Sequence, residues 1–239
     1  MNEIKKKYTC VSLGSNCFIK KYLSTISNQE THFFDYIGAP MWAINEIVES
    51  DFVANMYDQK DYDILVTKRN DKLVVHKKYF LVFQHDLQPG YTEKQFISNK
   101  EKYDRRSKRF IELLKKNTHI LFFKLEQFVS DVLYARWKEY EKDELQYIID
   151  FSTIIKTKYP HLIFACIYIN TKHETQYLCD SNVIILKADF DIDYDEPTEK
   201  TIRWENCVML IKKIIDDNYG FIVKCLNKKN IGYLDYKYD

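Results

Sequence analysis

Three apolar segments in the second half of the chain constrain the fold most strongly. Residues 118–125 (THILFFKL), 161–169 (HLIFACIYI) and 183–188 (VIILKA) each contain an uninterrupted apolar run of at least four residues. Strands of this kind lie in sheets that helices cover on both faces. The amphipathic segment 143–160 (DELQYIIDFSTIIKTKYP) lies between the first two and predicts a helix that Pro160 ends. The pattern therefore predicts a three-layer α/β/α fold with a mainly parallel, Rossmann-like sheet.

The rest of the chain alternates between short apolar runs and amphipathic stretches. No low-complexity linker interrupts it, so we expect a single α/β domain over 1–239, with a small β-hairpin insert at about 60–84. The other predicted elements are, in chain order, a strand at 8–13, helices at about 16–27 and after Pro40, β-rich runs at 62–67, 72–76 and 79–84, a long charged helix at 91–117, a helix at 201–220 closed by Gly220, and a last short strand or tail after it.

The composition excludes several classes of protein. Lys and Arg number 36 and Asp and Glu 35, so the net charge of +1 gives no overall attraction to nucleic acid or anionic membranes. No apolar run reaches the roughly 18–20 residues that span a bilayer, and the first residues have no signal-peptide core. The six cysteines are scattered without a Cys-x-x-Cys pair, which argues against a disulfide framework and a zinc ribbon. We expect a soluble, cytoplasmic protein without a metal or cofactor. Its frequent Lys, Asn, Ile and Tyr residues are typical of AT-rich genomes, such as those of large DNA viruses or low-GC bacteria.

Polar residues follow the predicted strands, where open α/β sheets bind their ligands. The first strand leads into Ser12, Gly14, Ser15, Asn16 and Cys17. His85 and Asp86 follow the run at 79–84, and Asn170 follows the run at 161–169. In a parallel sheet these residues share one rim. The sequence therefore predicts a site there.

Cys17 is the strongest candidate nucleophile. It lies where a helix is predicted to begin, and the positive end of a helix dipole favours the reactive thiolate. His85 could serve as its general base and acid, with Asp86, Asp35 or Asn170 orienting the imidazole. This reading predicts a cysteine-dependent hydrolase or acyl transferase whose substrate is a peptide, an isopeptide or another acyl group. The competing interpretation is that Cys17 is a small buried residue in a turn.

Anion binding is the second reading. Ser12, Gly14, Ser15 and Asn16 form a glycine turn before a helix, a place where phosphates bind, although no phosphate-loop or dinucleotide motif is present. Arg105, Arg106 and Arg109 of the run KYDRRSKRF could hold an anionic substrate, and Asn170 could contact it. This reading predicts a sugar- or nucleotide-handling enzyme, active for instance in glycan modification. A non-catalytic binding protein is the third reading, and the oligomeric state stays open.

The motifs SLGSNC, FFDYIGAPMWAI, FQHD and KYDRRSKRF occur in this order within the first 125 residues. Together they resemble the DUF1796 family of papain-like cysteine peptidases. The resemblance implies that Cys17 is the nucleophile and His85 its partner, with Asp86 or Asp35 in support. It also implies a papain-like α+β fold as the alternative to the parallel sheet.

Overall fold

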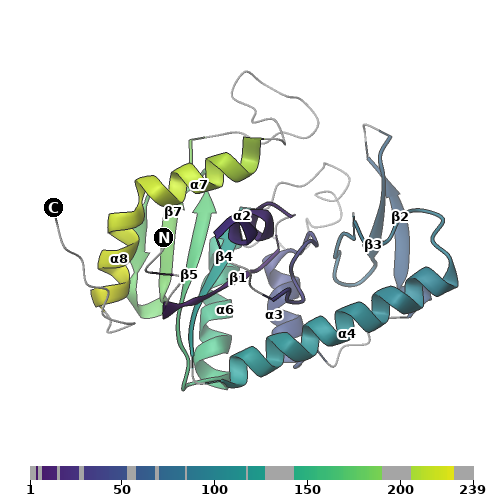
Figure 1. The fold of residues 1–239 in the computed structure, drawn as a ribbon, viewed down its shortest axis with the longest axis horizontal. Helices are drawn as coiled ribbons and strands as arrows, with labels where there is room; N and C mark the ends of the chain where they lie inside the picture. The colour runs from purple at the N-terminus through teal and green to yellow at the C-terminus, as the bar shows by residue number, and fades with distance from the viewer. Residues whose placement is uncertain are drawn as a thin grey trace.

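The computed structural model describes residues 4, 7–14, 17–26, 30–52, 58–67, 70–83, 85–116, 118–126, 143–189 and 206–228. Its main sheet has five strands in the order β1-β4-β5-β7-β6 (Figure 1). The first four are parallel to their neighbours, and only the edge strand β6 runs antiparallel. The strands are β1 (Thr9–Ser12), β4 (His119–Leu125), β5 (Ile163–Asn170), β6 (Gln176–Leu178) and β7 (Val183–Lys187). The mainly parallel α/β sheet is thus confirmed.

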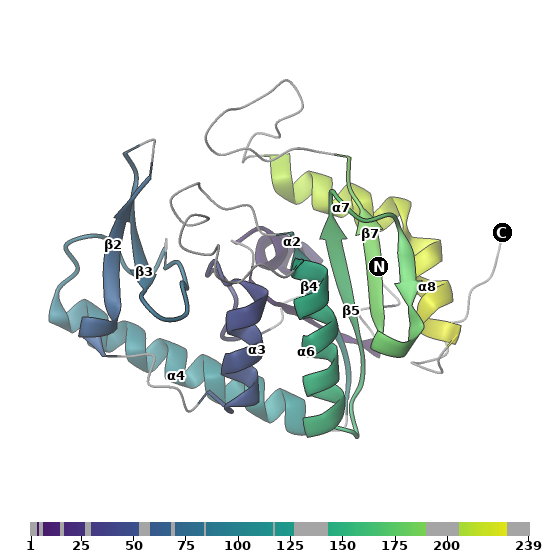
Figure 2. The same ribbon diagram turned by 180° about the vertical axis from the view of Figure 1, so that it is seen from behind.

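Helices cover both faces of this sheet, as the apolar runs predict (Figures 1 and 2). One face packs against α2 (Phe18–Ile26), α7 (Cys207–Asp217) and α8 (Tyr219–Lys228). The other packs against α3 (Met41–Glu49), α4 (Glu93–Lys115) and α6 (Glu144–Lys158).

Neighbouring residues of β4 contribute their side chains to two different hydrophobic cores, one on each face of the sheet. Phe122 packs into the core under α3, α4 and α6, and Phe123 packs into the core under α2, α7 and α8. Both side chains are fully buried. Burying a side chain of this size contributes roughly 1.5–3 kcal/mol. A strand that alternates between two cores in this way has no face left for solvent.

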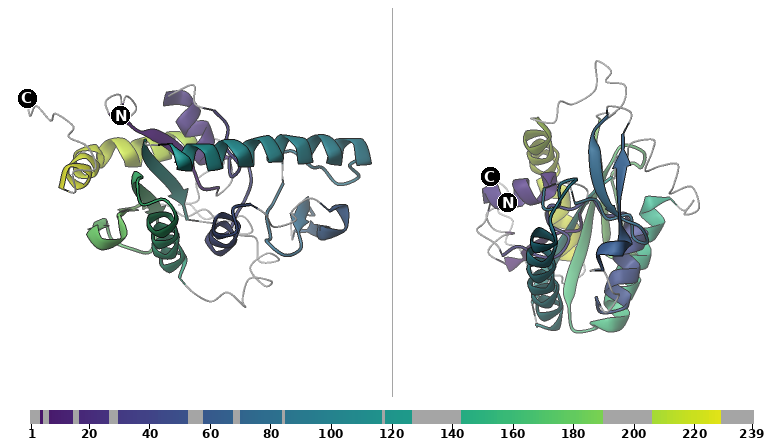
Figure 3. Two further views of the ribbon diagram at one scale, coloured as in Figure 1. Left: turned by 90° about the horizontal axis from the view of Figure 1, so that it is seen from below. Right: turned by 90° about the vertical axis from the view of Figure 1, so that its right-hand side faces the viewer.

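A second, two-stranded sheet lies apart from the main one. Strands β2 (Tyr62–Val66) and β3 (Lys72–His76) form an antiparallel hairpin, as predicted. Helix α4 extends past the main sheet to this hairpin (Figure 3). Aromatic contacts join the two, since the rings of Tyr62 and Phe96 have centroids 5.3 Å apart.

Two predicted elements differ from the structure. The run 79–84 is not a third strand of the hairpin: Val82 makes only isolated bridges to Gly38 and Val75, while Leu81 and Phe83 fill the core under α4. The apolar residues of this run hold the connection between β3 and α4 against the core. Gly220 does not close α7, which ends at Asp217 with Asn218 as its C-cap, because Gly220 belongs to the following helix α8, where a strand or tail is predicted.

Among the described residues no helix is both long enough and apolar enough to cross a membrane. The cytoplasmic location stays a prediction.

Candidate functional site

Strand β1 ends against the segment that leads into α3. Gly14 has a φ of +77°, and a Cβ atom there would lie 3.1 Å from the Ala39 Cβ and 3.2 Å from the Ile37 carbonyl oxygen. Glycine is therefore required both by the left-handed backbone and by the close approach. This contact joins SLGSNC to FFDYIGAP. Ser15 and Asn16 lie outside the described residues.

Asp35, two residues before Ile37, is the centre of a buried polar group. Its Oδ2 atom lies 3.0 Å from the Lys20 Nζ of α2 and accepts a hydrogen bond of 2.8 Å from the His32 backbone N–H. Burial raises the pKa of Asp35, although the charge of Lys20 and this hydrogen bond partly offset the effect. We call Lys20, His32, Asp35, Asp86 and Arg106 the Asp35 cluster.

Helix α4 brings the arginine to this cluster. It begins with a capping box in which the Gln95 backbone N–H and the Thr92 backbone N–H each bond to the other residue's side chain, at 3.3 and 2.7 Å. About three turns later, Arg106 packs over the ring of Tyr103 at 5.0 Å, and its positive charge lowers the pKa of Asp35 against the effect of burial. The predicted anion-binding arginine is therefore buried beside a predicted acid.

Asp86 is the outer carboxylate of the cluster. Its oxygens pair with Lys102 at 2.7 Å and with Arg106 at 3.6 Å, and Tyr103 donates a hydrogen bond to it. Burial alone would raise the pKa of Asp86, but the hydrogen bonds and charges of these neighbours lower it below its ordinary value. Asp86 thus remains an anion held by α4. It follows an apolar connection rather than a strand of the main sheet, so the predicted rim position is wrong for it and for His85.

His32 closes the inner side of the cluster. Burial, together with the positive charges of Lys20 and Arg109, lowers the pKa of His32 to about 4. The ring is therefore neutral at pH 7. Arg109 itself is half-buried, and its Nε donates to the Arg105 carbonyl oxygen at 3.4 Å, so it acts on the cluster through charge.

Several buried polar atoms here have no hydrogen-bond partner. They are the His32 Nδ1, the Asp35 Oδ1 and the Arg106 Nη1, of which the last lies 3.6 Å from the Asp86 Oδ2 as an ion pair without a hydrogen bond. Ser12, the last residue of β1, is fully buried, and its Oγ also has no partner. A buried polar atom without a partner costs about 1–3 kcal/mol. Three of the four atoms lie in the motif segments, and buried polar atoms of this kind are commonly bound by a polar ligand or by ordered water.

Cys17 and His85 are not brought together by any described interaction. Cys17 lies at the start of α2, as predicted, but is only 1% exposed and packs among the apolar side chains under α2, α7 and α8. His85 is exposed, and within the described part of the chain no hydrogen bond or ion pair reaches its side chain. The proposed partners Asp86 and Asp35 are bound to other groups.

Asn170 lies at the carboxyl end of β5 and is fully buried. Its side-chain oxygen accepts hydrogen bonds from the backbone N–H groups of Lys172 and His173, at 3.0 and 2.5 Å. Its amide nitrogen donates to the Leu186 carbonyl oxygen of β7 at 3.3 Å. Asn170, predicted to bind substrate, therefore shapes the turn that carries His173.

Glu126 orders the same turn from the end of β4. It is 6% exposed and accepts hydrogen bonds of 2.8 Å from both the backbone N–H and the hydroxyl of Thr171. Lys172 adds an ion pair at 3.0 Å. Two buried polar side chains on neighbouring strands thus fix the loop after β5.

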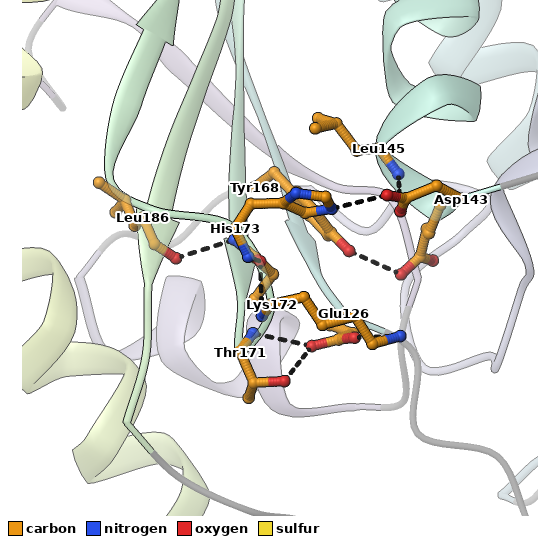
Figure 4. Close-up of polar contacts among 10 residues, drawn as sticks. Glu126, Asp143, Leu145, Tyr168, Thr171, Lys172, His173 and Leu186 are labelled. Atoms are coloured by element: carbon orange, nitrogen blue, oxygen red, sulfur yellow. Dashed lines mark hydrogen bonds and ion pairs between the residues drawn. The ribbon is translucent and has the colours of Figure 1, made fainter.

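His173 extends from this turn to Asp143, the N-cap of α6 (Figure 4). The His173 Nε2 lies 2.8 Å from the Asp143 Oδ2, and the side chains are 25% and 49% exposed. We call Asp143 and His173 the rim dyad. No residue of the dyad was among the predicted site residues. The spacing of an Asn at a strand end and a His three residues later was the signal available for it.

A buried lysine lies on the α3 side of the same strands. The Lys124 Nζ donates to the Ala39 carbonyl oxygen at 2.8 Å and lies 3.4 Å from the Glu144 carboxylate, to which the Tyr168 hydroxyl also donates. Burial lowers the pKa of Lys124 and raises that of Tyr168. This trio ties β4 and β5 to the start of α6.

No group of three or more His, Cys, Asp or Glu side chains suited to a metal ion occurs in the described part of the chain. Comparisons of the chain with protein-family models, with curated proteins and with solved structures found no match. The resemblance to the DUF1796 family therefore stays a prediction.

Proposed function

We propose that this chain is a sugar- or nucleotide-handling α/β protein that binds a phosphorylated, hydroxyl-bearing ligand at the Asp35 cluster. The observation that carries the proposal is the set of buried atoms without hydrogen-bond partners: the Asp35 Oδ1, the Arg106 Nη1 and the His32 Nδ1 of the Asp35 cluster, and the Ser12 Oγ at the end of β1. They come from segments far apart in the sequence, which a shared role in binding would explain.

The chemistry of these atoms favours such a ligand. Arg106 offers a charged N–H donor, which suits a phosphate or carboxylate oxygen. The Asp35 Oδ1 offers an acceptor for a hydroxyl group. Ser12 can serve in either role. A sugar phosphate or nucleotide carries both kinds of group within one small molecule.

The location supports the same reading. Ligands of open α/β sheets bind outside the carboxyl ends of the strands, and Ser12 and Gly14 stand at that end of β1. The outer part of the cluster reaches solvent, since the Lys102 side chain beside Asp86 is 34% exposed. An anion could therefore approach from the surface and meet Lys102 before Arg106.

The cysteine hydrolase has less support. It requires an accessible thiolate within reach of an imidazole, and Cys17 is 1% exposed without a bond to His85. A non-catalytic binding protein would use the same cluster and would differ only in lacking turnover.

Isothermal titration calorimetry with UDP-glucose, GDP-mannose, ribose 5-phosphate and inorganic phosphate tests the proposal. At least one phosphorylated sugar should bind more tightly than inorganic phosphate. Arg106→Lys keeps the charge but loses the planar fork, so its affinity should fall about tenfold. Arg105→Lys, on the exposed neighbour, should leave the affinity unchanged. Absence of binding by all four probes, or equal losses in the two variants, would refute the proposal, and circular dichroism would verify that both variants fold.

A further inference from the structure

The rim dyad lies outside the Asp35 cluster, at the carboxyl edge of the sheet, where Gly14 contacts Ile37 and Ala39 of the segment that carries Asp35. Asn170 ends β5 and Ser12 ends β1, and β4 lies between these two parallel strands. Neighbouring strands are about 4.8 Å apart, and Ser12 is level with Ile167, three residues before Asn170, so the two strand ends are roughly 14 Å from each other. A sugar nucleotide is long enough to span this distance, whereas inorganic phosphate is not.

His173 is held as a proton-transfer group is held in many enzymes. Its backbone N–H is fixed by the buried Asn170, and its Nε2 faces the Asp143 carboxylate at 2.8 Å. In this structure the contact is an ion pair without hydrogen-bond geometry, since the Nε2 atom has no hydrogen-bond partner. A small rotation of the ring would let Asp143 accept the Nε2 proton, which selects the tautomer whose Nδ1 is basic. The Nδ1 atom is therefore the one that can accept a proton, and the ring is 25% exposed, which gives a ligand access.

We infer that His173 is the general base of this protein and acts on a hydroxyl group at the sugar end of a ligand whose phosphate lies at the Asp35 cluster. The inference rests on the proposed function. The step is a proton transfer: the O–H bond of the ligand breaks, a bond between that proton and the His173 Nδ1 forms, and the electron pair stays on the ligand oxygen. Asp143 balances the positive charge of the resulting imidazolium.

The surrounding network supports this role over a purely structural one. Glu126 and Asn170 are both almost fully buried, and the side-chain oxygens of both accept hydrogen bonds from the turn at 171–173. The turn carries only one ring at its end, that of His173. Buried polar side chains that fix a partly exposed imidazole are a typical way to position a catalytic base.

Carbethoxylation by diethyl pyrocarbonate, located by peptide mass spectrometry, tests the inference directly. Excess UDP-glucose or GDP-mannose, whichever binds in the calorimetry above, should slow modification of His173 at least fivefold. Inorganic phosphate should give no protection, because it fills only the anion end. His161 is the internal control, since it is exposed and precedes β5 at the opposite edge of the sheet. Its modification rate should not change.

Two variants separate this inference from the proposed function. His173→Gln should bind the sugar nucleotide within threefold of wild type, while Arg106→Lys should lose both binding and the protection of His173. In the free protein, ¹⁵N NMR should find the His173 proton on Nε2 in wild type and a mixture of tautomers in Asp143→Asn. Binding without protection of His173, or a wild-type proton on Nδ1, would overturn the inference and leave the proposed function standing. Absence of any sugar-nucleotide binding would overturn both.

Discussion

The Lys20 Nζ lies 3.0 Å from the Asp35 Oδ2, and the two side chains are only 6% and 1% exposed. This ion pair joins α2 to the segment before α3 around the edge of β1. Two charges removed from water must compensate each other, because either one alone in the interior is costly. The pair therefore stabilises the contact between α2 and the segment before α3, and it is also part of the candidate site.

Removal of one partner should destabilise the protein strongly. We expect Lys20→Met to lower the free energy of unfolding by roughly 3 kcal/mol, because it leaves the Asp35 carboxylate buried without its cation. Asp35→Asn should cost less when Lys20 is already Met, so the double variant should be at least about 1 kcal/mol more stable than the sum of the single losses predicts. Urea unfolding measures all three.

The exposed pair Lys212–Asp216 on α7 provides the control for this cycle. Lys212→Met should change the free energy of unfolding by less than about 0.5 kcal/mol. Additive losses in the Lys20 and Asp35 variants would mean that the two charges do not depend on each other.

Two glycines with left-handed backbone allow a matched comparison. Gly14→Ala should cost the strain of a positive φ and, in addition, a close contact with Ala39 and the Ile37 carbonyl oxygen. Gly90→Ala, where nothing lies within 4 Å of the new Cβ, should cost only the strain of about 1 kcal/mol. Thermal unfolding should therefore place Gly14→Ala clearly below Gly90→Ala. Equal melting temperatures would argue against the close approach of the two motif segments.

Cysteine reactivity distinguishes the hydrolase reading from the one that we favour. Because Cys17 is 1% exposed, iodoacetamide should alkylate it at least a hundredfold more slowly than the exposed Cys179 in the native protein. After unfolding in guanidinium chloride the two rates should converge. Peptide mass spectrometry follows both residues in one sample. If Cys17 in the native protein reacts as fast as Cys179, and reacts more slowly in His85→Ala, the hypothesis that Cys17 is a catalytic nucleophile would be supported again.

Acid should weaken the fold through two buried histidines. Burial lowers the pKa of His32 and of His76 to about 4, from 6.5. The unfolded chain therefore takes up protons first, and the stabilisation that is complete above pH 6.5 is lost as the pH falls toward 4. The difference amounts to at most ~3 kcal/mol per histidine. Protonation of His76 also removes two hydrogen bonds that its Nδ1 accepts from the backbone N–H groups of Lys78 and Tyr79.

Denaturant unfolding at several pH values measures this effect. His32→Gln and His76→Gln should each reduce the loss of stability between pH 6.5 and pH 4.5. His161→Gln, at an exposed position, should not change that slope. A slope that none of the three substitutions changes would show that other groups drive the acid sensitivity.

The main sheet could be predicted because its strands are apolar on both faces, a pattern that few other structures share. Strand β6 could not, because QYL is short, half-exposed and without alternation. The run 79–84 was wrongly predicted as a strand because a connection that packs into a core has the same apolar composition as a strand. Gly220 gave a wrong helix end because glycine is frequent just after helices. Here α7 ends earlier, and Gly220 lies in the first turn of α8.

The site was only partly predictable. Asp35, Asp86 and Arg106 were recognisable as separate candidates, but nothing in the local sequence of Lys20 or His32 links them to Asp35. Such contacts depend on where α2 and α4 pass the edge of β1, which is a property of tertiary packing. The position of Cys17 was predicted correctly, yet its burial under α7 depends on residues almost two hundred positions later.

The pairing of β1 with β4 has a consequence for synthesis on the ribosome. Thr9 pairs with Ile120, so the first strand cannot pair until a segment about 110 residues later has been made, and β4 is its only neighbour among the described strands. As a chain emerges from its N-terminus, the glycine turn and Asp35 leave the exit tunnel long before the strand that fixes them. The N-terminal segment is therefore exposed as a nascent chain for several seconds, during which chaperones can reach it.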